Sequence, residues 1–517
     1  MNGADRLCDT LLASGIDVCF ANPGTSEMHF VAALDRKLAM RCVLALFEGV
    51  ATGAADGYGR MAGKPAATLL HTGPGLANGL ANLHNARRAR TPLVNIVGDH
   101  ATYHLGFDAP LSTDIDSLAR PMSNFVRRAT GADDVEPAAE AMIAAAIETP
   151  GVATLILPSD AAWGSISTDD EARSARIAPA PQVDEARIAE LADALQAAGG
   201  RAGLLLAGTA PHGAALELAG RIAARTGARL FGEVLNGRSE RGGGCVPLER
   251  TPYPIGEATA ALADLTLLVL VGAREPVAFF AYPGKPSRLL PEGCDVLTLA
   301  EAGDDMRDAL ERLADRLGAS HTPPRRPVAA LAPAMPSGRL TEDAVSIIAA
   351  AGLPEDAIVV DEGLTSGRRF YALSASGPRH DYLMCTGGAI GTGMPLSVGA
   401  AIACPDRKVV TLQADGSGMY TLQALWTAAR EKLDILVVIF ANRAYAILRL
   451  EMGNVGVTGF GHNADRMLRL DEPALDWVSL ARGMGVEAAR ADTCERFADL
   501  YRSAVRTKGP FLIEAVI

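Results

Sequence analysis

Two oxygen-bearing side chains, Asp415 and Asn442, each follow the end of an apolar run, and Gly416 and Ser417 come directly after the acid. Carboxylate and amide oxygens suit Mg2+, which proteins commonly hold through one or two side chains together with substrate phosphates. A glycine lets the backbone approach a ligand closely, and backbone amides at a helix start favour an anion. The pattern therefore indicates a site for Mg2+ and a phosphate group. The alternative is structural, with Asp415 capping a helix and Asn442 filling a turn.

The stretch between these residues has the pattern of a strand, a helix and a second strand. The apolar runs 409–412 and 435–440 predict the strands, and 422–430 has the periodicity of a helix. Loops at the carboxyl ends of neighbouring parallel strands lie at one edge of the sheet, where ligands of open α/β sheets bind. We therefore expect Asp415 and Asn442 to meet at that edge.

Two side chains that can exchange protons, Glu48 and His71, follow predicted strands near the N-terminus. Glu48 comes after the apolar run 42–47 and before a helix rich in small residues, so we expect it to be buried. His71 comes after the run 66–70 and before a glycine-rich turn, and a histidine exchanges protons near pH 7. The alternatives are a glutamate that only complements a helix dipole and a histidine that is only a satisfied loop residue.

The alternation of apolar runs and helical stretches continues along the chain and predicts three α/β domains with doubly wound parallel sheets. Segments rich in proline, alanine and charged residues, 168–184 and 321–337, separate them. We place an N-terminal domain at 1–165, a central domain at 185–318 and a C-terminal domain at 338–517.

Composition excludes several classes of protein. The length of 517 residues allows two to four domains, and a net charge of −12 argues against a nucleic-acid partner. The eight cysteines form no Cys-x-x-Cys pair, which indicates free thiols in a reducing compartment. No apolar signal core opens the chain and no apolar run reaches about 18 residues, so we expect a cytoplasmic protein without a membrane partner. The central domain has no Gly-x-Gly-x-x-Gly fingerprint, so a dinucleotide site is not supported.

The segment from Asp415 to Asn442 resembles the thiamin diphosphate (ThDP) signature, which runs Gly-Asp-Gly, some two dozen residues, then Asn. The upstream residues that match the same pattern are Val398, Gly399, Pro405, Val410 and Leu412. The resemblance covers nearly the whole chain and is to the superfamily of acetolactate synthase, pyruvate decarboxylase and benzoylformate decarboxylase. One departure is Ala414, which stands in place of the first glycine; its methyl group could crowd the turn and weaken cofactor binding.

The resemblance implies ThDP and Mg2+ as cofactors, and FAD is unlikely because the central domain lacks the motifs of FAD-binding acetolactate synthases. It implies that Glu48 activates the cofactor, that His71 is catalytic or contacts substrate, and that Ile390 props ThDP into its bent shape. Thr25 and Ser26, in a loop of the form Asn-Pro-Gly-x-x-Glu, are expected beside the substrate pocket together with His71. The implied cofactor-binding residues are Glu48, Leu364, Thr365, Ile390, Asp415, Gly416, Ser417, Asn442, Tyr445 and Ala446, and the implied metal ligands are Asp415, Asn442 and the backbone oxygen of Ala444.

The implied reaction is decarboxylation or carboligation of a small 2-oxo acid, through ylide attack and an enamine, by a carboxy-lyase or an acyl-transferring carboligase. The turn 72–75 resembles acetolactate synthases, whereas His71 resembles benzoylformate decarboxylases; the second histidine of the latter has no counterpart near Phe279, Phe280 and Tyr282. Two points stay open: which 2-oxo acid reacts, and whether the enamine then takes up a proton or attacks a second carbonyl compound. The alternatives are a weak or inactive ThDP-binding paralogue, motivated by Ala414, and a C–C lyase on a 2-hydroxyacyl-type substrate.

The resemblance also implies an oligomer. Glu48 belongs to the first predicted domain, whereas the diphosphate site belongs to the third. In this superfamily the two come from different subunits. We therefore expect a homodimer or homotetramer with active sites between subunits.

Overall fold

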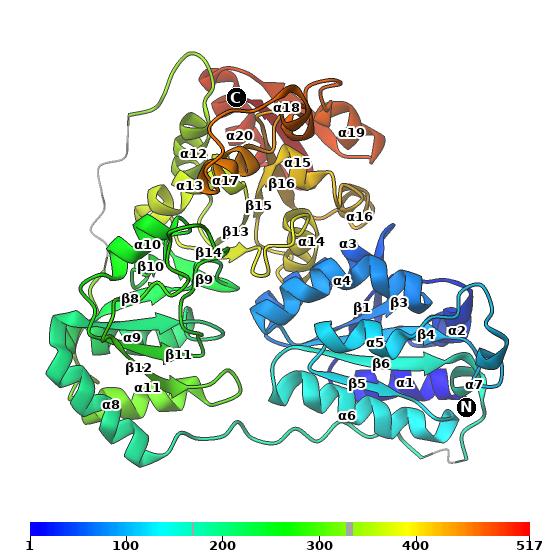
Figure 1. Cartoon of the computed structure of the whole chain (residues 1–517). Coiled ribbons are helices and arrows are strands. Elements are labelled where there is room, and N and C mark those ends of the chain that lie inside the picture. Colours follow the sequence, from blue (N-terminus) through cyan, green and yellow to red (C-terminus); the bar gives the residue numbers. More distant parts are fainter. Residues whose placement is uncertain (168–169, 327–333) are drawn as a thin grey trace.

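The computed structural model describes residues 1–167, 170–326 and 334–517, and these contain three sheets (Figure 1). The N-terminal sheet is parallel throughout, in the order β2-β1-β3-β4-β6-β5. Its strands are β1 (Val18–Asn22), β2 (Arg41–Leu44), β3 (Ala66–Leu70), β4 (Leu93–Asp99), β5 (Phe125–Arg128) and β6 (Val152–Pro158). Its helices are α1 (Gly3–Ala13), α2 (Met28–Arg36), α3 (Glu48–Ala62), α4 (Thr72–Ala89), α5 (Ile115–Ala119), α6 (Val135–Glu148) and α7 (Ser159–Trp163).

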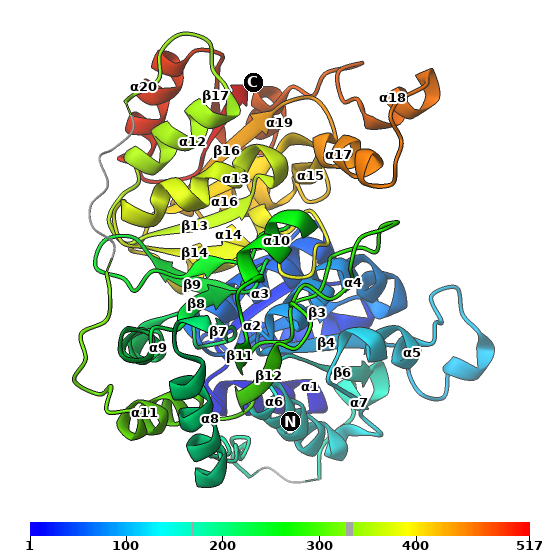
Figure 2. The same cartoon turned by 60° about the vertical axis from the view of Figure 1, so that its left-hand side comes forward.

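The central sheet is also parallel, in the order β10-β8-β7-β11-β12. Its strands are β7 (Ala202–Leu206), β8 (Arg229–Gly232), β10 (Glu249–Arg250), β11 (Leu267–Val271) and β12 (Asp295–Ala300). Its helices are α8 (Glu185–Ala198), α9 (Gly213–Thr226), α10 (Ile255–Leu262) and α11 (Met306–Arg316). Figure 2 shows this domain below the C-terminal one, with α8, α9 and α11 on its outer side.

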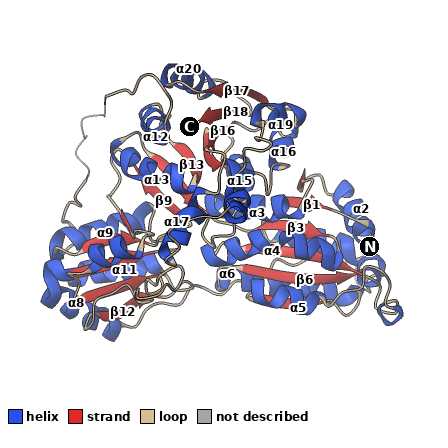
Figure 3. Cartoon of the chain, turned by 45° about the horizontal axis from the view of Figure 1, so that its top comes forward, coloured by secondary structure: helices blue, strands red, loops and turns tan. Residues whose placement is uncertain are grey.

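The C-terminal sheet has seven strands in the order β17-β18-β16-β15-β13-β14-β9. Its strands are β9 (Arg238–Arg241), β13 (Ala357–Glu362), β14 (His380–Met384), β15 (Val409–Ala414), β16 (Ile435–Ala441), β17 (Glu487–Ala491) and β18 (Phe511–Val516). Its helices are α12 (Glu342–Ala351), α13 (Leu364–Leu373), α14 (Gly393–Ala403), α15 (Asp415–Gly418), α16 (Ala424–Arg430), α17 (Ala446–Asn454), α18 (His462–Leu468), α19 (Trp477–Gly483) and α20 (Cys494–Ala504). Three parallel-sheet α/β domains are therefore present, as the sequence predicted (Figure 3).

One strand connects two domains in a way that the sequence did not indicate. β9 lies in the range assigned to the central domain, yet it pairs antiparallel with β14 at the edge of the C-terminal sheet. Its sequence, Arg-Ser-Glu-Arg, has no apolar alternation that would mark a strand. Its register is fixed by polar contacts instead, since Arg238 Nε donates to Asp381 Oδ1 at 2.7 Å and the Arg241 guanidinium stacks 3.3 Å from the Tyr371 ring centre.

The N- and C-terminal domains are joined by the packing of α3 against α14, side by side in Figure 1. A Cβ on Gly57 would lie 2.1 Å from the Leu396 carbonyl oxygen, and one on Gly399 would lie 1.8 Å from the Ala54 oxygen. Only glycine permits this backbone contact. One hydrophobic core therefore runs through both domains. Among the described helices, none combines the length and apolarity needed to cross a membrane.

Candidate functional site

The C-terminal domain brings Asp415 and Asn442 together, as the strand–helix–strand pattern predicted. β15 and β16 pair in parallel, with Ala414 opposite Phe440, so the residues that follow them share one edge of the sheet. Asp415 is 2% exposed, and its Oδ2 accepts a hydrogen bond from the backbone N–H of Arg443, the residue after Asn442, at 2.6 Å. We call Asp415, Gly416, Asn442 and Ala444 the metal half-site, after the Mg2+ ligands that the family resemblance predicts there.

Backbone and side-chain hydrogen bonds orient both oxygen-bearing groups. Asp415 Oδ1 accepts from the backbone N–H of Gly416 at 2.8 Å, and Asn442 Oδ1 accepts from that of Ala444 at 3.0 Å. Asn442 Nδ2 donates to Ser366 Oγ at 3.2 Å, which ties the end of β16 to α13. Burial raises the pKa of Asp415 to about 6, against the opposing effect of these backbone donors. A bound cation would favour the ionised carboxylate here.

The other residues predicted to bind the cofactor lie around this half-site. Leu364 and Thr365 begin α13 at the end of β13, and both are half-buried. Ser417 is buried, and its Oγ accepts from Gln413 Nε2 at 2.6 Å. Tyr445 precedes Ala446, the first residue of α17, and the Tyr445 ring lies 2.6 Å from the position that a Cβ on Gly416 would take. Any larger residue at position 416 would therefore displace this ring.

Ala414, the departure from the ThDP signature, fits its backbone without strain. Its φ is −74° and its ψ is 146°, an extended conformation that any residue adopts. The turn in this chain therefore needs no glycine at position 414. Left-handed backbone occurs instead at Leu364, with φ 49°, and at Arg443, with φ 55°. Such conformations cost non-glycine residues roughly 1–3 kcal/mol and cluster where a chain holds a ligand.

A buried acid that sequence reasoning did not single out organises the loop before α14. Glu362 is 1% exposed, and it accepts hydrogen bonds from the backbone of Gly391 at 2.6 Å and of Gly393 at 2.7 Å, and from Gln413 Nε2 at 3.0 Å. Burial raises its pKa. The loop that Glu362 holds carries Ile390, which is half-buried. The sequence signal that could have identified Glu362 is its place two residues after the apolar run 357–360.

The N-terminal domain brings Glu48 and His71 close together on either side of Gly75. Glu48 is the first residue of α3 and is 7% exposed, buried as the sequence predicted. Its Oε2 accepts from Asn78 Nδ2 at 3.0 Å, and its Oε1 lies 3.0 Å from the position of a Cβ on Gly75. The same position lies 3.3 Å from the Cβ of His71, the residue before α4. Gly75, in the first turn of α4, therefore lies next to both the Glu48 carboxylate and the Cβ of His71.

His71 is held by an acid that we did not predict as a site residue. Its Nδ1 donates to Glu27 Oε2 at 2.8 Å, and Ser26 Oγ donates to Glu27 Oε1 at 2.5 Å and lies 3.1 Å from the same imidazole nitrogen. Two glycines make room for this contact. A Cβ on Gly24 would lie 2.2 Å from the His71 ring, and one on Gly98 would lie 1.8 Å from Glu27 Oε1.

We call Glu48, His71, Glu27, Ser26 and Gly75 the acid half-site. Ser26 is thus placed against His71, whereas the Thr25 side chain is exposed at the start of the short helix 25–27. Glu27 could have been found from sequence as the glutamate that closes the Asn-Pro-Gly-x-x-Glu stretch. Thr72, directly after His71, has a left-handed φ of 49°, and its buried Oγ1 has no hydrogen-bond partner among the described residues.

No hydrogen bond or ion pair joins the two half-sites within the described parts of the chain. Asn82 of α4 joins the start of α3 to the loop before α14, because its Nδ2 donates to the carbonyl of Gly49 at 2.7 Å and to that of Gly391 at 3.3 Å. The residue after Glu48 is therefore bonded to the loop that carries Ile390.

The chain is similar to known proteins over nearly its whole length. The family models for the N-terminal and C-terminal TPP binding domains of thiamine pyrophosphate enzymes match residues 1–119 and 365–515. A Mycobacterium tuberculosis protein, IlvX, provisionally named an acetolactate synthase large subunit, is 51% identical over 100% of this chain and 99% of its own. Benzoylformate decarboxylase of Pseudomonas aeruginosa is 28% identical over 98% of this chain and 97% of its own.

Among solved structures, the ThDP-dependent 4-hydroxybenzoylformate decarboxylase of Rhodococcus jostii superposes with a TM-score of 0.87 at 25% identity. The superposition covers 99% of this chain and 98% of that one. The two family models together cover more than half of the chain, and the relatives match it nearly end to end. The chain therefore belongs to the superfamily of ThDP-dependent enzymes that includes acetolactate synthases and benzoylformate decarboxylases.

Proposed function

We propose that this protein is a ThDP- and Mg2+-dependent decarboxylase of a small 2-oxo acid. The observation that carries the proposal is the contact of His71 with Glu27, one glycine away from the buried Glu48. Decarboxylation needs a group that delivers a proton after carbon dioxide has left. An imidazole held in one orientation by a carboxylate provides that group.

The residues of the metal half-site suit the diphosphate end of the cofactor. Asp415, Asn442 and the carbonyl of Ala444 form the all-oxygen donor set that Mg2+ prefers. The buried Oε1 of Gln413, which precedes Ala414 and Asp415, has no hydrogen-bond partner among the described residues. When bound, ThDP supplies a carbon nucleophile and accepts the electron pair left by decarboxylation.

The acid half-site would handle protons. Asn78 fixes one oxygen of the Glu48 carboxyl, so the other is free to hold a proton shared with the pyrimidine ring. The bond from His71 Nδ1 to Glu27 leaves Nε2 as the atom that exchanges a proton with the reacting carbon. Ser26, beside His71, and Thr25, exposed in the same loop, are candidates for contact with substrate.

The two half-sites lie in different domains, and among the residues that the structure describes no hydrogen bond or ion pair joins them within one chain, so we include in the proposal a homodimer or homotetramer. In it, the acid half-site of one subunit would face the metal half-site of another. Sedimentation velocity of the purified protein checks this part, and a monomer that is fully active would rule it out.

The test of the activity is carbon dioxide release with ThDP and Mg2+ across pyruvate and branched-chain, aromatic and guanidino 2-oxo acids. We expect one class to react and to yield an aldehyde. Glu48→Gln should reduce turnover by at least about a hundredfold while ThDP still binds. Glu342→Gln, which changes the exposed first residue of α12, is the matched control and should leave turnover unchanged. Unchanged turnover in Glu48→Gln refutes the mechanism.

A carboligase is the second candidate, because the 51% identical relative carries an acetolactate synthase name. Both reactions would use the same half-sites. They differ in whether the carbon nucleophile left after decarboxylation is protonated or attacks a second carbonyl compound. Identification of the product decides between them. A hydroxyketone or acetohydroxy acid instead of an aldehyde would replace the decarboxylase proposal with this one.

A further inference from the structure

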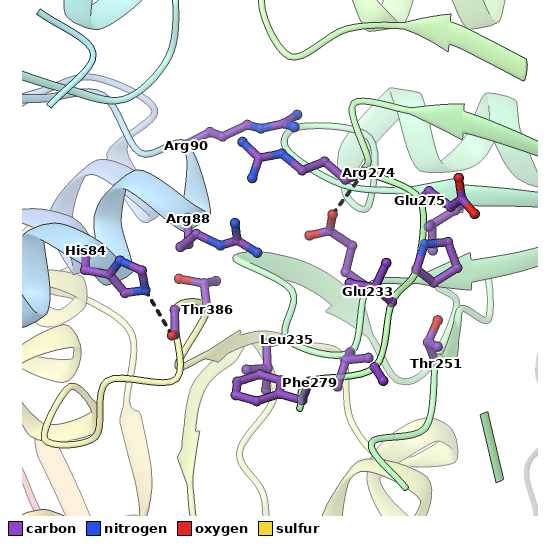
Figure 4. Close-up of a pocket in the computed structure, with 16 residues that line it drawn as sticks. His84, Arg88, Arg90, Glu233, Leu235, Thr251, Arg274, Glu275, Phe279 and Thr386 are labelled. Atoms are coloured by element: carbon purple, nitrogen blue, oxygen red, sulfur yellow. Dashed lines mark hydrogen bonds between the residues drawn. The ribbon is translucent and has the colours of Figure 1, made fainter. Parts of the chain in front are cut away.

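A cavity of about 320 Å3 lies where the three domains meet, and no residue of either half-site lines it (Figure 4). Its walls are the C-terminal end of α4, the segments that follow β8 and β11, and the turn at Thr386 and Gly387. β8 and β11 belong to the parallel central sheet. The cavity therefore sits at the carboxyl edge of that sheet, the edge at which open α/β sheets bind ligands.

Three arginine side chains reach this cavity from two domains. Arg88 and Arg90 come from the end of α4, and Arg274 comes from the opposite wall, after β11; Figure 4 shows the three guanidinium groups turned toward the same space. One carboxylate, that of Glu233, faces them. The guanidinium groups of Arg88 and Arg274 have no hydrogen bond or ion pair among the residues that the structure describes. The cavity is thus positively charged in a chain whose net charge is −12.

The surroundings of Glu233 and Arg90 show how closely these charges are placed. Burial raises the pKa of Glu233. The backbone N–H of Arg274 donates to Glu233 Oε1 at 3.3 Å, and this hydrogen bond opposes the rise. Burial also lowers the pKa of Arg90; the charges of Arg274 and Arg88 add to that effect, and those of Glu233 and Glu301 oppose it. Glu275 also lines the cavity, but its carboxylate is paired with Arg288, so an anion between the three arginines would relieve the repulsion that remains among them.

The dipole of α4 does not explain this arrangement by itself. Cations at a helix C-terminus are favourable, which accounts for Arg88. It does not account for Arg274, which belongs to another domain. Arg90 has a left-handed φ of 56°, where glycine or asparagine is the usual residue, and its guanidinium donates to the carbonyl of Gly272 in the opposite wall. The Arg90 side chain is therefore held across the domain boundary at a cost to its backbone.

We propose that this cavity binds a small organic anion through a phosphate or carboxylate group held by Arg88, Arg90 and Arg274. Arginine suits both groups, because its planar fork of donors matches their oxygen atoms. Phe279 provides an apolar wall for the organic part of the ligand. The volume is at the lower end of the range for small-molecule sites, which fits a compact metabolite rather than a dinucleotide.

The ligand would contact the loop that leads to the cofactor. Gly387 lies in the cavity wall, where its carbonyl accepts from His84 Nε2 at 3.1 Å, and Ile390 is three residues further along. A Cβ on Gly388 would lie 2.6 Å from the Phe279 ring, so this ring packs directly on the loop. Occupancy of the cavity should therefore also slow hydrogen exchange of the backbone amides in 386–390.

The test is calorimetry on the protein saturated with ThDP and Mg2+, so that the cofactor's own phosphate site is filled. Inorganic phosphate is the probe in one arm and malonate in the other. We expect one equivalent of at least one probe to bind. Arg88→Gln and Arg274→Gln should each weaken that binding by about tenfold or more, the value of one charge-assisted hydrogen bond. Both side chains are exposed, so neither change should disturb folding.

Arg87→Gln is the matched control, because Arg87 lies in the same last turn of α4 but does not line the cavity, and its affinity should equal the wild-type value. Binding of phosphate identifies a phosphate-bearing ligand, and binding of malonate alone identifies a carboxylate. The proposal is overturned if neither probe binds, or if Arg88→Gln and Arg274→Gln bind as tightly as wild type, which would place the anion elsewhere. The readout needs no turnover and is independent of the proposed reaction.

Discussion

Replacing Gly75 by alanine should reduce activity without unfolding the protein. The new Cβ would lie 3.0 Å from Glu48 Oε1 and 3.3 Å from the Cβ of His71, whereas ordinary contacts begin at 3.4 Å. The carboxylate would therefore have to move by about 0.4 Å. A misplacement of about 1 Å at a reacting group can cost roughly a hundredfold in rate, so a shift of this size should lower kcat by about five- to tenfold.

The stability of the Gly75→Ala variant should change little. Position 75 lies inside α4, where alanine is favoured over glycine by roughly 0.5–1 kcal/mol, and this gain offsets part of the crowding. Steady-state kinetics of carbon dioxide release and a thermal melt together measure both effects. Gly256→Ala is the matched control, because Gly256 lies in α10 with open space around it. A Gly75→Ala variant with full kcat would show that Glu48 and His71 are not the groups that carry the reaction.

Three further predictions concern the metal half-site, the domain interface and a buried histidine. Asp415→Asn removes the charge of the proposed Mg2+ ligand, so ThDP binding followed by fluorescence should lose its dependence on Mg2+. Gly399→Ala would place a Cβ 1.8 Å from the Ala54 carbonyl oxygen and should lower the free energy of unfolding by about 3 kcal/mol or more, measured in urea. His380 is 1% exposed and burial lowers its pKa from 6.5 to about 4, so its contribution to stability is present above pH 6.5 and is lost as the pH falls toward 4. That loss is about 3 kcal/mol, and the urea midpoint of His380→Asn should therefore fall less steeply than that of wild type over this pH range.

The parts of the site that follow from parallel strands could be predicted from the sequence. Asp415 and Asn442 come after neighbouring apolar runs, and the carboxyl ends of parallel strands must share an edge. The same reasoning placed Glu48 and His71 at the ends of runs in the N-terminal domain, where the structure finds them on either side of Gly75. Their catalytic roles come from family resemblance and stay predictions.

Contacts that depend on loops or on polar residues could not be predicted. Glu27 meets His71 only because Gly24 and Gly98 leave space for the two side chains, and no periodicity marks that space. β9 is polar along its length and joins the C-terminal sheet through Arg238, so a pattern of apolar residues could not reveal it. The arginine-lined cavity likewise needs the tertiary structure, since Arg274 stands 184 positions after Arg90 in the chain.

Side chains of the N-terminal domain set the shape of the C-terminal loop that carries Ile390. Asn85 of α4 is fully buried, and its Oδ1 accepts from the backbone of Gly387 at 3.1 Å and of Ala389 at 3.2 Å, while its Nδ2 donates to the Ala389 carbonyl at 2.7 Å. Breaking one of these hydrogen bonds would leave a buried polar group unsatisfied, at a cost of roughly 1–3 kcal/mol. The loop therefore shifts only together with α4. α4 also begins with the turn that separates Glu48 from His71 and ends at the arginine-lined cavity. The helix α4 therefore connects the acid half-site, the loop that carries Ile390 and the proposed anion site. A ligand in the cavity would contact this loop directly through Gly387, whereas it can act on the acid half-site through α4.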